Sequence, residues 1–293
     1  MDKFSILKES QERDYNEYLK LMDASASQKI LDIFPQLRRQ KGTTILDLGC
    51  GSGLLTYHLA KLNPDHKVVG IDICKDLVDQ ANKKYKLPNL EFQCSSLDKI
   101  KFSNVSNIIL SSVLHEIYSY SKFDTHKEKL GEVYKFIDLI YSFLVKNGKI
   151  IIRDFVRPEN NYDIVTFEHL KNDHNVNTEF INFTKLFGNE TYLSNIKGKL
   201  IEETEISKKY KTNLETFYKY IFRKDYHVNW KNELNERYGF WNETEIIEIK
   251  DRTKSVLLFR YLNNPWIIEN RIDGKVISKS IPNYQILVTI IKK

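Results

Sequence analysis

A short glycine run behind a carboxylate is the stretch of the chain where ligand chemistry is most expected. Residues Thr43–Gly53 read TTILDLGCGSG, with glycines at alternate positions, Gly49, Gly51 and Gly53. Glycine permits a tight turn with positive φ and lets a ligand lie against bare backbone. Asp47, just before the turn, carries a negative charge that attracts an ammonium group and repels a phosphate. The pattern therefore predicts a site for a ligand with a positively charged amino group.

The elements on either side must position this turn. Thr43–Asp47 is β-branched or apolar and predicts a short buried strand, and Leu54–Leu62 has the apolar spacing of a helix. A strand, a glycine turn and a helix form the nucleotide-binding βα unit. The spacing G-x-G-x-G departs from the G-x-G-x-x-G of dinucleotide enzymes, which disfavours an NAD-dependent enzyme. The alternative is an ordinary glycine-rich turn without a ligand.

The segment DLGCGSG resembles motif I of the class I S-adenosylmethionine (SAM) methyltransferases. In that family the acid and the glycine loop hold the methionine part of SAM. The resemblance implies SAM as the cofactor and S-adenosylhomocysteine (SAH) as the product. It assigns cofactor-binding roles to Asp47, Gly49, Cys50, Gly51 and Gly53.

A second acid stands at the end of the next predicted strand. Lys67–Ile73 reads KVVGIDI, a buried run that ends in Asp72 and Ile73. An acid at the end of the second strand of a doubly wound sheet can accept hydrogen bonds from both ribose hydroxyls. GIDI also resembles motif II of the family, which implies that Ile73 covers one face of the adenine.

The loop after the third predicted strand, Leu90–Cys94, departs from the family pattern. The family carries there an Asp that binds the adenine amino group, and the matching position in this sequence is Ser96. A Ser hydroxyl and the backbone N–H of Leu97 can still reach the adenine. Asp98 is the alternative if the loop is shifted.

The exit of the fourth strand, predicted at Asn107–Leu114, carries the candidate catalytic residues. SSVLHEIYSY resembles motif IV of small-molecule methyltransferases, where the strand end faces both SAM and substrate. Ser111 is expected at the cofactor. His115, which can titrate near neutrality, is the candidate base or substrate-orienting group. Glu116 is expected to orient His115 or to bind a substrate cation. The alternative for His115 is a ring packed over SAM without acid–base work.

Substrate contacts are expected around the same strand ends. Tyr118 and Tyr120 follow the motif, and Arg153 and Asp154 end a fifth strand at Lys149–Phe155. Arg153 suits a substrate carboxylate because its guanidinium binds carboxylates in a bidentate way. A structural salt bridge of Arg153 with Asp154 or Glu116 is the alternative.

The pattern as a whole predicts an α/β fold. The resemblance implies a doubly wound, seven-stranded, mostly parallel sheet with a terminal antiparallel hairpin strand and N-terminal helices, and the long stretch between strands five and six predicts a helical insertion there. The last two strands are predicted at Ser255–Tyr261 and Tyr284–Ile291. The expected domains are an N-terminal helical cap at 1–42, a SAM-binding core at 43–156, a helical lid or substrate-recognition insertion at 157–213, and a C-terminal helix with closing core strands at 214–293.

Composition adds weak constraints. Lys and Arg number 45 against 39 Asp and Glu, a net charge of +6, and no dense basic block suggests nucleic-acid binding. The cysteines, Cys50, Cys74 and Cys94, lack metal-ligand spacing, so we expect free thiols, a cytoplasmic protein and no metal ion. The charged N-terminus and the lack of a long apolar run predict no signal peptide and no membrane span. The oligomeric state stays open, a homodimer included.

The function that fits best is SAM-dependent transfer of a methyl group to an N or O nucleophile of a small molecule or peptide by in-line displacement. The aromatic SSVLHEIYSY exit and the long insertion favour an enclosed acceptor. An RNA methyltransferase with the same core is the alternative. A protein that binds SAM without catalysis is a third hypothesis, which the intact Asp47, glycine loop and Asp72 disfavour. The acceptor, the need for a general base and the role of the insertion are open.

Overall fold

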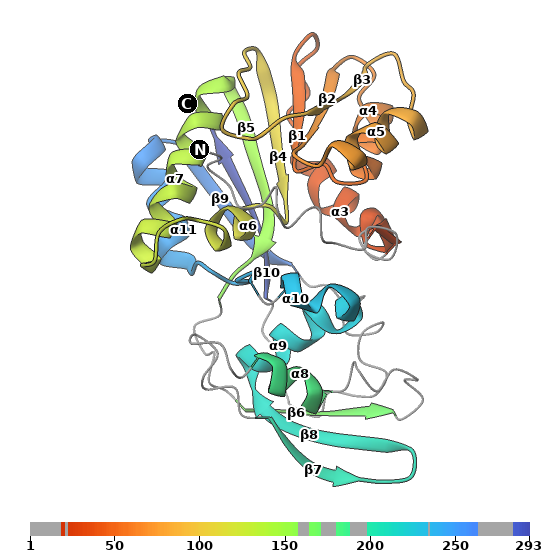
Figure 1. Cartoon of the computed structure of the whole chain (residues 1–293). Helices are drawn as coiled ribbons and strands as arrows, with labels where there is room; N and C mark the ends of the chain where they lie inside the picture. Colours follow the sequence, from red (N-terminus) through yellow and green to blue (C-terminus); the bar gives the residue numbers. More distant parts are fainter. Residues whose placement is uncertain are drawn as a thin grey trace. The chain divides into compact units, whose positions relative to one another are not determined.

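The computed structural model describes residues 19–20, 23–157, 164–170, 180–187, 198–233, 235–262 and 284–293. Two compact units make up the chain. The first comprises Met1–Val156, Asn235–Tyr261 and Gln285–Lys293, and the second Arg157–Leu234 and Leu262–Tyr284. Figure 1 labels their elements. No helix within the described ranges is both long and apolar enough to cross a membrane.

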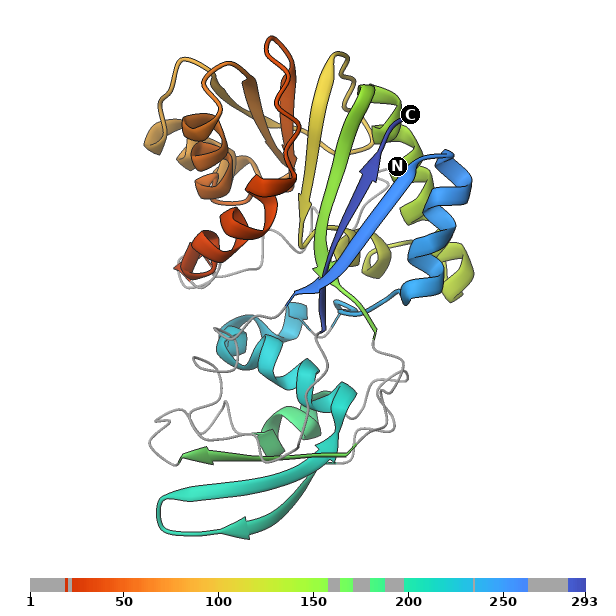
Figure 2. The ribbon, with the colours of Figure 1, turned by 180° about the vertical axis from the view of Figure 1, so that it is seen from behind.

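The first unit is built on a seven-stranded sheet in the order β3-β2-β1-β4-β5-β10-β9. The strands from β1 to β5 pair in parallel, and β10 runs antiparallel to β5. Figure 2 shows β10 between β5 and β9. This arrangement confirms the predicted sheet. The bounds are Thr44–Leu48 (β1), Lys67–Asp72 (β2), Leu90–Cys94 (β3), Val105–Ser111 (β4), Leu144–Phe155 (β5), Val256–Leu262 (β9) and Gln285–Ile291 (β10).

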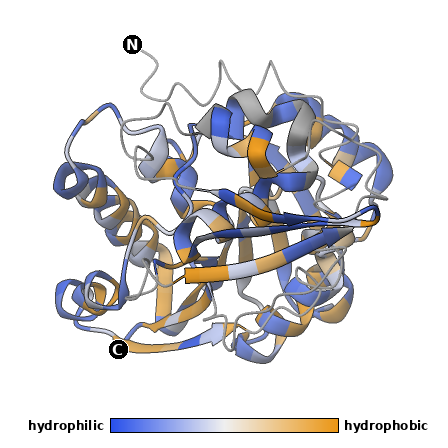
Figure 3. Ribbon diagram, turned by 90° about the horizontal axis from the view of Figure 1, so that it is seen from below, coloured by the Kyte–Doolittle hydropathy of each residue, from blue (hydrophilic) through white to orange (hydrophobic). Residues whose placement is uncertain are grey.

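Helices lie on both faces of this sheet because successive strand residues point to opposite sides. Leu46 and Leu48 of β1 belong to the core cluster that includes apolar residues of α7 and α11. On the other face, Asp47 bonds to Thr56 of α4, and α5 packs on Phe92 of β3. Figure 3 shows that individual helices carry both hydrophilic and hydrophobic residues, as helices that pack on a sheet do. The bounds are Ala26–Ile33 (α3), Leu54–Leu62 (α4), Lys75–Lys84 (α5), Leu114–Ser119 (α6), His126–Phe143 (α7) and Glu243–Thr253 (α11), with a 3-10 turn, η1, at Phe34–Gln36.

The second unit contains a three-stranded antiparallel sheet, β6-β8-β7. The described part of the segment 157–213, expected to be a helical insertion, thus contains three strands as well as one helix, α8. Tyr210 and Thr212 are buried at alternate positions of β8, a strand pattern hidden among lysines. Phe167 of β6 packs against Phe180 of α8, with ring centroids 5.1 Å apart. The bounds are Ile164–Leu170 (β6), Phe180–Phe187 (α8), Lys199–Glu203 (β7) and Ser207–Asn213 (β8).

The segment after β8 also differs from the expectation. In place of one helix that returns to the core, it forms α9 (Leu214–Arg223), a 3-10 turn η3 (Lys224–Asn229) and α10 (Trp230–Glu233), all within the second unit. The helix breaks near Tyr226, whose φ of −88° and ψ of 28° are not helical. The second unit thus extends beyond residue 213, where the insertion was expected to end. Its role as a lid stays a prediction.

A buried ion pair ties α3 to the sheet. Arg153 Nε of β5 lies 3.0 Å from Asp32 Oδ2, and the two residues are only 2% and 5% exposed. Arg153 also donates to Gln285 Oε1 of β10 at 3.3 Å. The alternative for Arg153, a structural salt bridge, is thus found with Asp32 in place of Asp154 or Glu116. Asp154 is its neighbour in the strand and therefore points to the opposite face of the sheet.

We predict that Arg153→Ala destabilises the protein by about 3–5 kcal/mol, because it leaves the Asp32 carboxylate buried without its partner. Urea unfolding measures this loss. The matched control is Arg260→Ala: Arg260 Nη2 lies 3.7 Å from Asp32 Oδ1, but its side chain is 53% exposed. That variant should lose less than about 1 kcal/mol. Equal losses in the two variants would contradict a structural role specific to Arg153.

Candidate functional site

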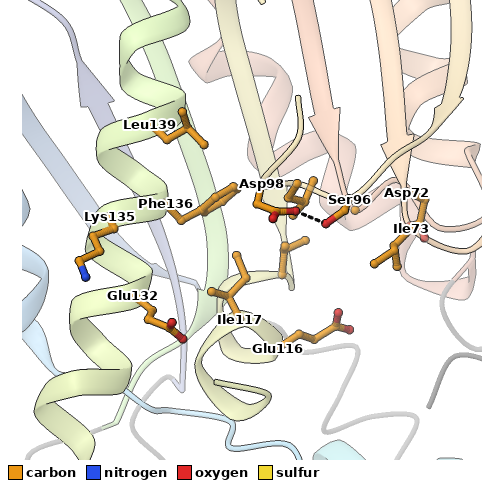
Figure 4. Close-up of a pocket in the computed structure, with 13 residues that line it drawn as sticks. Asp72, Ile73, Ser96, Asp98, Glu116, Ile117, Glu132, Lys135, Phe136 and Leu139 are labelled. Carbon is orange, nitrogen blue, oxygen red and sulfur yellow. Dashed lines mark hydrogen bonds between the residues drawn. The ribbon is translucent and has the colours of Figure 1, made fainter. Parts of the chain in front are cut away.

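A cavity of about 330 Å³ lies at the carboxyl ends of the parallel strands in the first unit. Open α/β sheets bind their ligands at this edge. Figure 4 shows side chains of its wall, which come from the end of β2 and the loop that follows, from the loop after β3, and from α6 and α7. The wall is formed by Gly49, Asp72, Ile73, Ser96, Leu97, Asp98, Val113, Glu116, Ile117, Glu132, Lys135, Phe136 and Leu139.

The glycine loop has room for backbone only. Gly49 has a φ of +74°, and a Cβ there would lie 2.5 Å from Val113 Cγ2. Gly53 has a φ of +77°, and a Cβ there would lie 2.6 Å from the ring of Phe92. Both glycines are thus required by conformation and by space. Gly49 faces the cavity, whereas Cys50, Gly51 and Gly53 set the path of the loop behind it.

Asp72 joins the glycine loop to the end of β2. Its Oδ2 accepts a hydrogen bond from the backbone N–H of Gly51 at 2.8 Å, and its Oδ1 accepts one from Cys74 at 2.9 Å. Burial raises the pKa of Asp72, while the N–H groups of Cys74 and Gly51 act in the opposite direction. Each carboxylate oxygen can accept a second hydrogen bond. Asp72 can therefore bind ligand hydroxyls from the cavity wall, beside Ile73.

The loop after β3 brings all three candidate adenine residues to the cavity wall. Ser96 Oγ donates a hydrogen bond to Asp98 Oδ1 (Figure 4), and Leu97 lies between them in the chain. Phe136 and Leu139 of α7 supply an apolar wall that the sequence analysis missed. Apolar residues on a helix usually pack in the core, so nothing in the sequence indicated that these two line a cavity.

Asp47 and Ser111 lie deeper at the same strand ends. Asp47 is 1% exposed and accepts a hydrogen bond from Thr56 Oγ1 at 2.6 Å. Burial raises the pKa of Asp47 to about 6, against the opposing effects of Thr56 and Lys29 of α3. Ser111 Oγ is buried and has no hydrogen-bond partner among the described residues. A ligand amino group would suit both positions, so these side chains and the bare glycine loop fit the methionine end of SAM.

His115 is held between two buried acids. Its Nδ1 lies 2.8 Å from Asp154 Oδ1, and its Nε2 lies 3.6 Å from Glu236 Oε2. Burial alone would lower the pKa of His115, but the carboxylates of Asp154 and Glu236 raise it to about 10. These two carboxylates favour the protonated ring of His115, which does not suit the expected role as a general base. Glu236, which the sequence analysis missed, lies far along the chain from His115 and carries no motif.

Of the other catalytic and substrate residues predicted near His115, one lines the cavity and four do not. Glu116 lines the cavity. The hydroxyl of Tyr120 donates to Glu236 Oε1 at 3.3 Å. The hydroxyl of Tyr118 lies 2.7 Å from His126 Nδ1, and its ring stacks on Phe240. The cavity wall does not include Tyr118, Tyr120, Arg153 or Asp154, the four predicted substrate residues.

The comparison with protein families agrees with this geometry. A family model described as a methyltransferase domain matches residues 39–222, which is more than half of the chain. The chain belongs to the methyltransferase domain family. This finding confirms the expected class I SAM-dependent methyltransferase family, whose cofactor is SAM.

Individual relatives of this chain are distant, and the chain spans only 34–39% of the length of the malonyl-[acyl-carrier protein] O-methyltransferases that it matches. It is 26% identical over 107 residues to a malonyl-[acyl-carrier protein] O-methyltransferase of Acetivibrio thermocellus, covering 36% of this chain and 37% of that protein. It is 27% identical over 183 residues to a demethylmenaquinone methyltransferase of Lactobacillus johnsonii, covering 59% and 68%. A solved SAM-dependent methyltransferase of Mesorhizobium loti superposes with a TM-score of 0.54 at 12% identity, over 92% and 99% of the two chains. The last likeness shows the fold alone.

We predict that Asp72→Ala lowers the affinity for SAH at least about tenfold. One hydrogen bond to a charged group contributes about 1.5–3 kcal/mol, and about 1.4 kcal/mol corresponds to a factor of ten. Isothermal titration calorimetry gives the affinity. Asp76→Ala, which removes an exposed acid from the first turn of α5, should bind SAH as the wild type does. Unchanged affinity in Asp72→Ala would remove Asp72 from the site.

We also predict a pH dependence that originates at Asp47. Its pKa is raised from 3.8 to about 6, so the carboxylate becomes protonated as the pH falls through this value. The attraction for the ammonium group of SAH is then lost, and the affinity should fall up to about tenfold by pH 5. Calorimetry over a pH series tests this. Asp47→Asn should bind SAH weakly, and its affinity should not change with pH in this range. If the affinity of this variant fell with pH as it does in the wild type, Asp47 would not be the group responsible.

Proposed function

We propose that this methyltransferase transfers a methyl group from SAM to an N or O nucleophile of a small molecule or peptide. The observation that carries the proposal is the cavity at the strand ends, where Gly49, Asp72 and the loop Ser96–Asp98 form one wall. The family match supports the reaction class. The relatives described above are named for malonyl-[acyl-carrier protein] and for demethylmenaquinone, neither of which is a nucleic acid, and this supports an acceptor outside the nucleic acids here.

The chemistry needs alignment more than activation. SAM, when bound, supplies a methyl carbon on a sulfonium, and in-line attack forms the bond to the acceptor as the C–S bond breaks and its electron pair goes to sulfur, giving SAH. The residues of the chain position the reactants and exclude water. In our proposal Asp72 fixes the ribose, Ser96–Asp98 and Ile73 hold the adenine, and Asp47 with Ser111 holds the methionine amino group.

Glu116 is the group we propose for the acceptor side. It lines the cavity, and its carboxylate can take the proton that an N–H or O–H acceptor loses, or bind an acceptor cation. His115 is the positioning residue in this proposal, since Asp154 and Glu236 both face its ring. Tyr120 and Asp154 act with it as supporting groups.

RNA is the less favoured acceptor. The described residues of the cavity wall include four carboxylates, those of Asp72, Asp98, Glu116 and Glu132, and one lysine, Lys135. Acids at this place repel phosphodiesters, because like charges in a partly buried site are weakly screened.

A cytoplasmic location and the oligomeric state of the protein stay predictions. Cys50, Cys74 and Cys94 are free thiols.

The test is a pair of ligand comparisons on the full chain. We expect SAH at a hundred times its Kd to stabilise the protein by about 2.7 kcal/mol and so raise the Tm, whereas NAD should leave the Tm unchanged. The opposite pattern would overturn the SAM site. Salt-dependent binding of unfractionated RNA, with a steep loss of affinity as salt increases, would move the acceptor proposal to the RNA alternative.

A further inference from the structure

We propose that His115, Glu116 and Glu236 form a binding site for one divalent metal ion that accepts an imidazole nitrogen, of the Mn²⁺ or Zn²⁺ type. The sequence analysis expected no metal because it considered cysteine spacing. The three residues come instead from α6 and from the segment between α10 and α11. These residues would bind the metal ion whether or not the methyl acceptor proposed above is correct.

The donor atoms are already close together. One ligand atom from each of the three side chains lies within 4.8 Å of those of the other two. His115 Nε2 and Glu236 Oε2 are 3.6 Å apart. Two ligands bonded to one metal at about 2.1 Å lie about 3.4 Å apart in tetrahedral geometry. The His115–Glu236 pair therefore needs little movement, and Glu116, on the cavity wall, is placed to close the third position.

The outer contacts orient this ligand set. A metal-bound histidine characteristically donates its other ring N–H to a carboxylate. Here His115 Nδ1 lies 2.8 Å from Asp154 Oδ1, which directs Nε2 toward Glu236. The Tyr120 hydroxyl donates to Glu236 Oε1, so that contact leaves Oε2 facing His115.

The charges of the group suit a dication. Glu116 and Glu236 supply two carboxylates to the ligand set, which match the charge of a dication. An ion bound at Nε2 of His115 takes the place of a proton, which is released to solvent. Imidazole nitrogen favours Mn²⁺ or Zn²⁺ over Mg²⁺, whereas carboxylates accept all three. An ion can reach the group from the cavity, because Glu116 lines it.

The test measures metal binding directly. Full-length protein is stripped with EDTA, passed into metal-free buffer and titrated with MnCl₂ while free Mn²⁺ is followed by electron paramagnetic resonance. We expect one Mn²⁺ per chain, competition by ZnCl₂, and ¹⁴N coupling from one imidazole in the pulsed spectrum. Glu116→Gln and Glu236→Gln should weaken binding at least about tenfold, and Asp154→Asn by about 10–100-fold. Glu91→Gln on β3, far from the group in the sheet, should bind as the wild type does.

The SAH-induced rise in Tm is recorded for each variant as a check of folding that is independent of the metal. If Glu236→Gln does not fold by this check, the metal site is judged from two other measurements. These are the ¹⁴N coupling of Mn²⁺ bound to wild-type protein and the Mn²⁺ affinity of Glu116→Gln. The proposal is overturned if wild-type protein takes up no Mn²⁺ or Zn²⁺ at millimolar concentration, if bound Mn²⁺ shows no ¹⁴N coupling, or if Glu116→Gln binds as tightly as Glu91→Gln. The group would then be an ion-pair cluster only, and the SAM site would be unaffected.

Discussion

The exit of β4 depends on one buried carboxylate. Asp154 Oδ2 accepts hydrogen bonds from the backbone N–H groups of Leu114 at 2.9 Å and His115 at 3.3 Å. Its Oδ1 accepts one from the N–H of Phe155 and contacts the His115 ring, each at 2.8 Å. A buried donor left without a partner costs about 1–3 kcal/mol, so the start of α6, and with it the place of Glu116, is fixed from the end of β5.

Aromatic residues enclose this arrangement. Tyr238 stacks on Phe155 with ring centroids 4.4 Å apart, and it meets the His115 ring edge-on at 4.8 Å. Trp241, fully buried, donates from Nε1 to the carbonyl of Phe155 at 2.9 Å. A site lined in this way excludes water, which strengthens the electrostatic interactions among His115, Asp154 and Glu236. The segment just before α11, which carries Glu236, Tyr238 and Trp241, thus contributes side chains around His115 as well as joining two helices.

Local patterns predicted the sheet and one side of the site. Leu90–Cys94 matches β3 at both ends, and Gly49 and Asp72 line the cavity as a βα turn requires. Contacts between distant segments could not be predicted in this way: Glu236 meets Tyr120 across 116 residues, and no spacing rule spans that separation. The strand β8 was missed because its three buried residues, Ser207, Tyr210 and Thr212, stand among lysines, which hid the alternation.

The second unit is assembled from two separate stretches of chain, Arg157–Leu234 and Leu262–Tyr284. The first stretch interrupts the core between β5 and α11, and the second interrupts it between β9 and β10. Exchanging this unit with that of a related enzyme therefore means grafting both pieces together at four junctions. A chimaera that carries only the longer piece would set Tyr218 of one parent against Tyr284 of the other, a stacked pair with ring centroids 4.5 Å apart whose side-chain volumes must match.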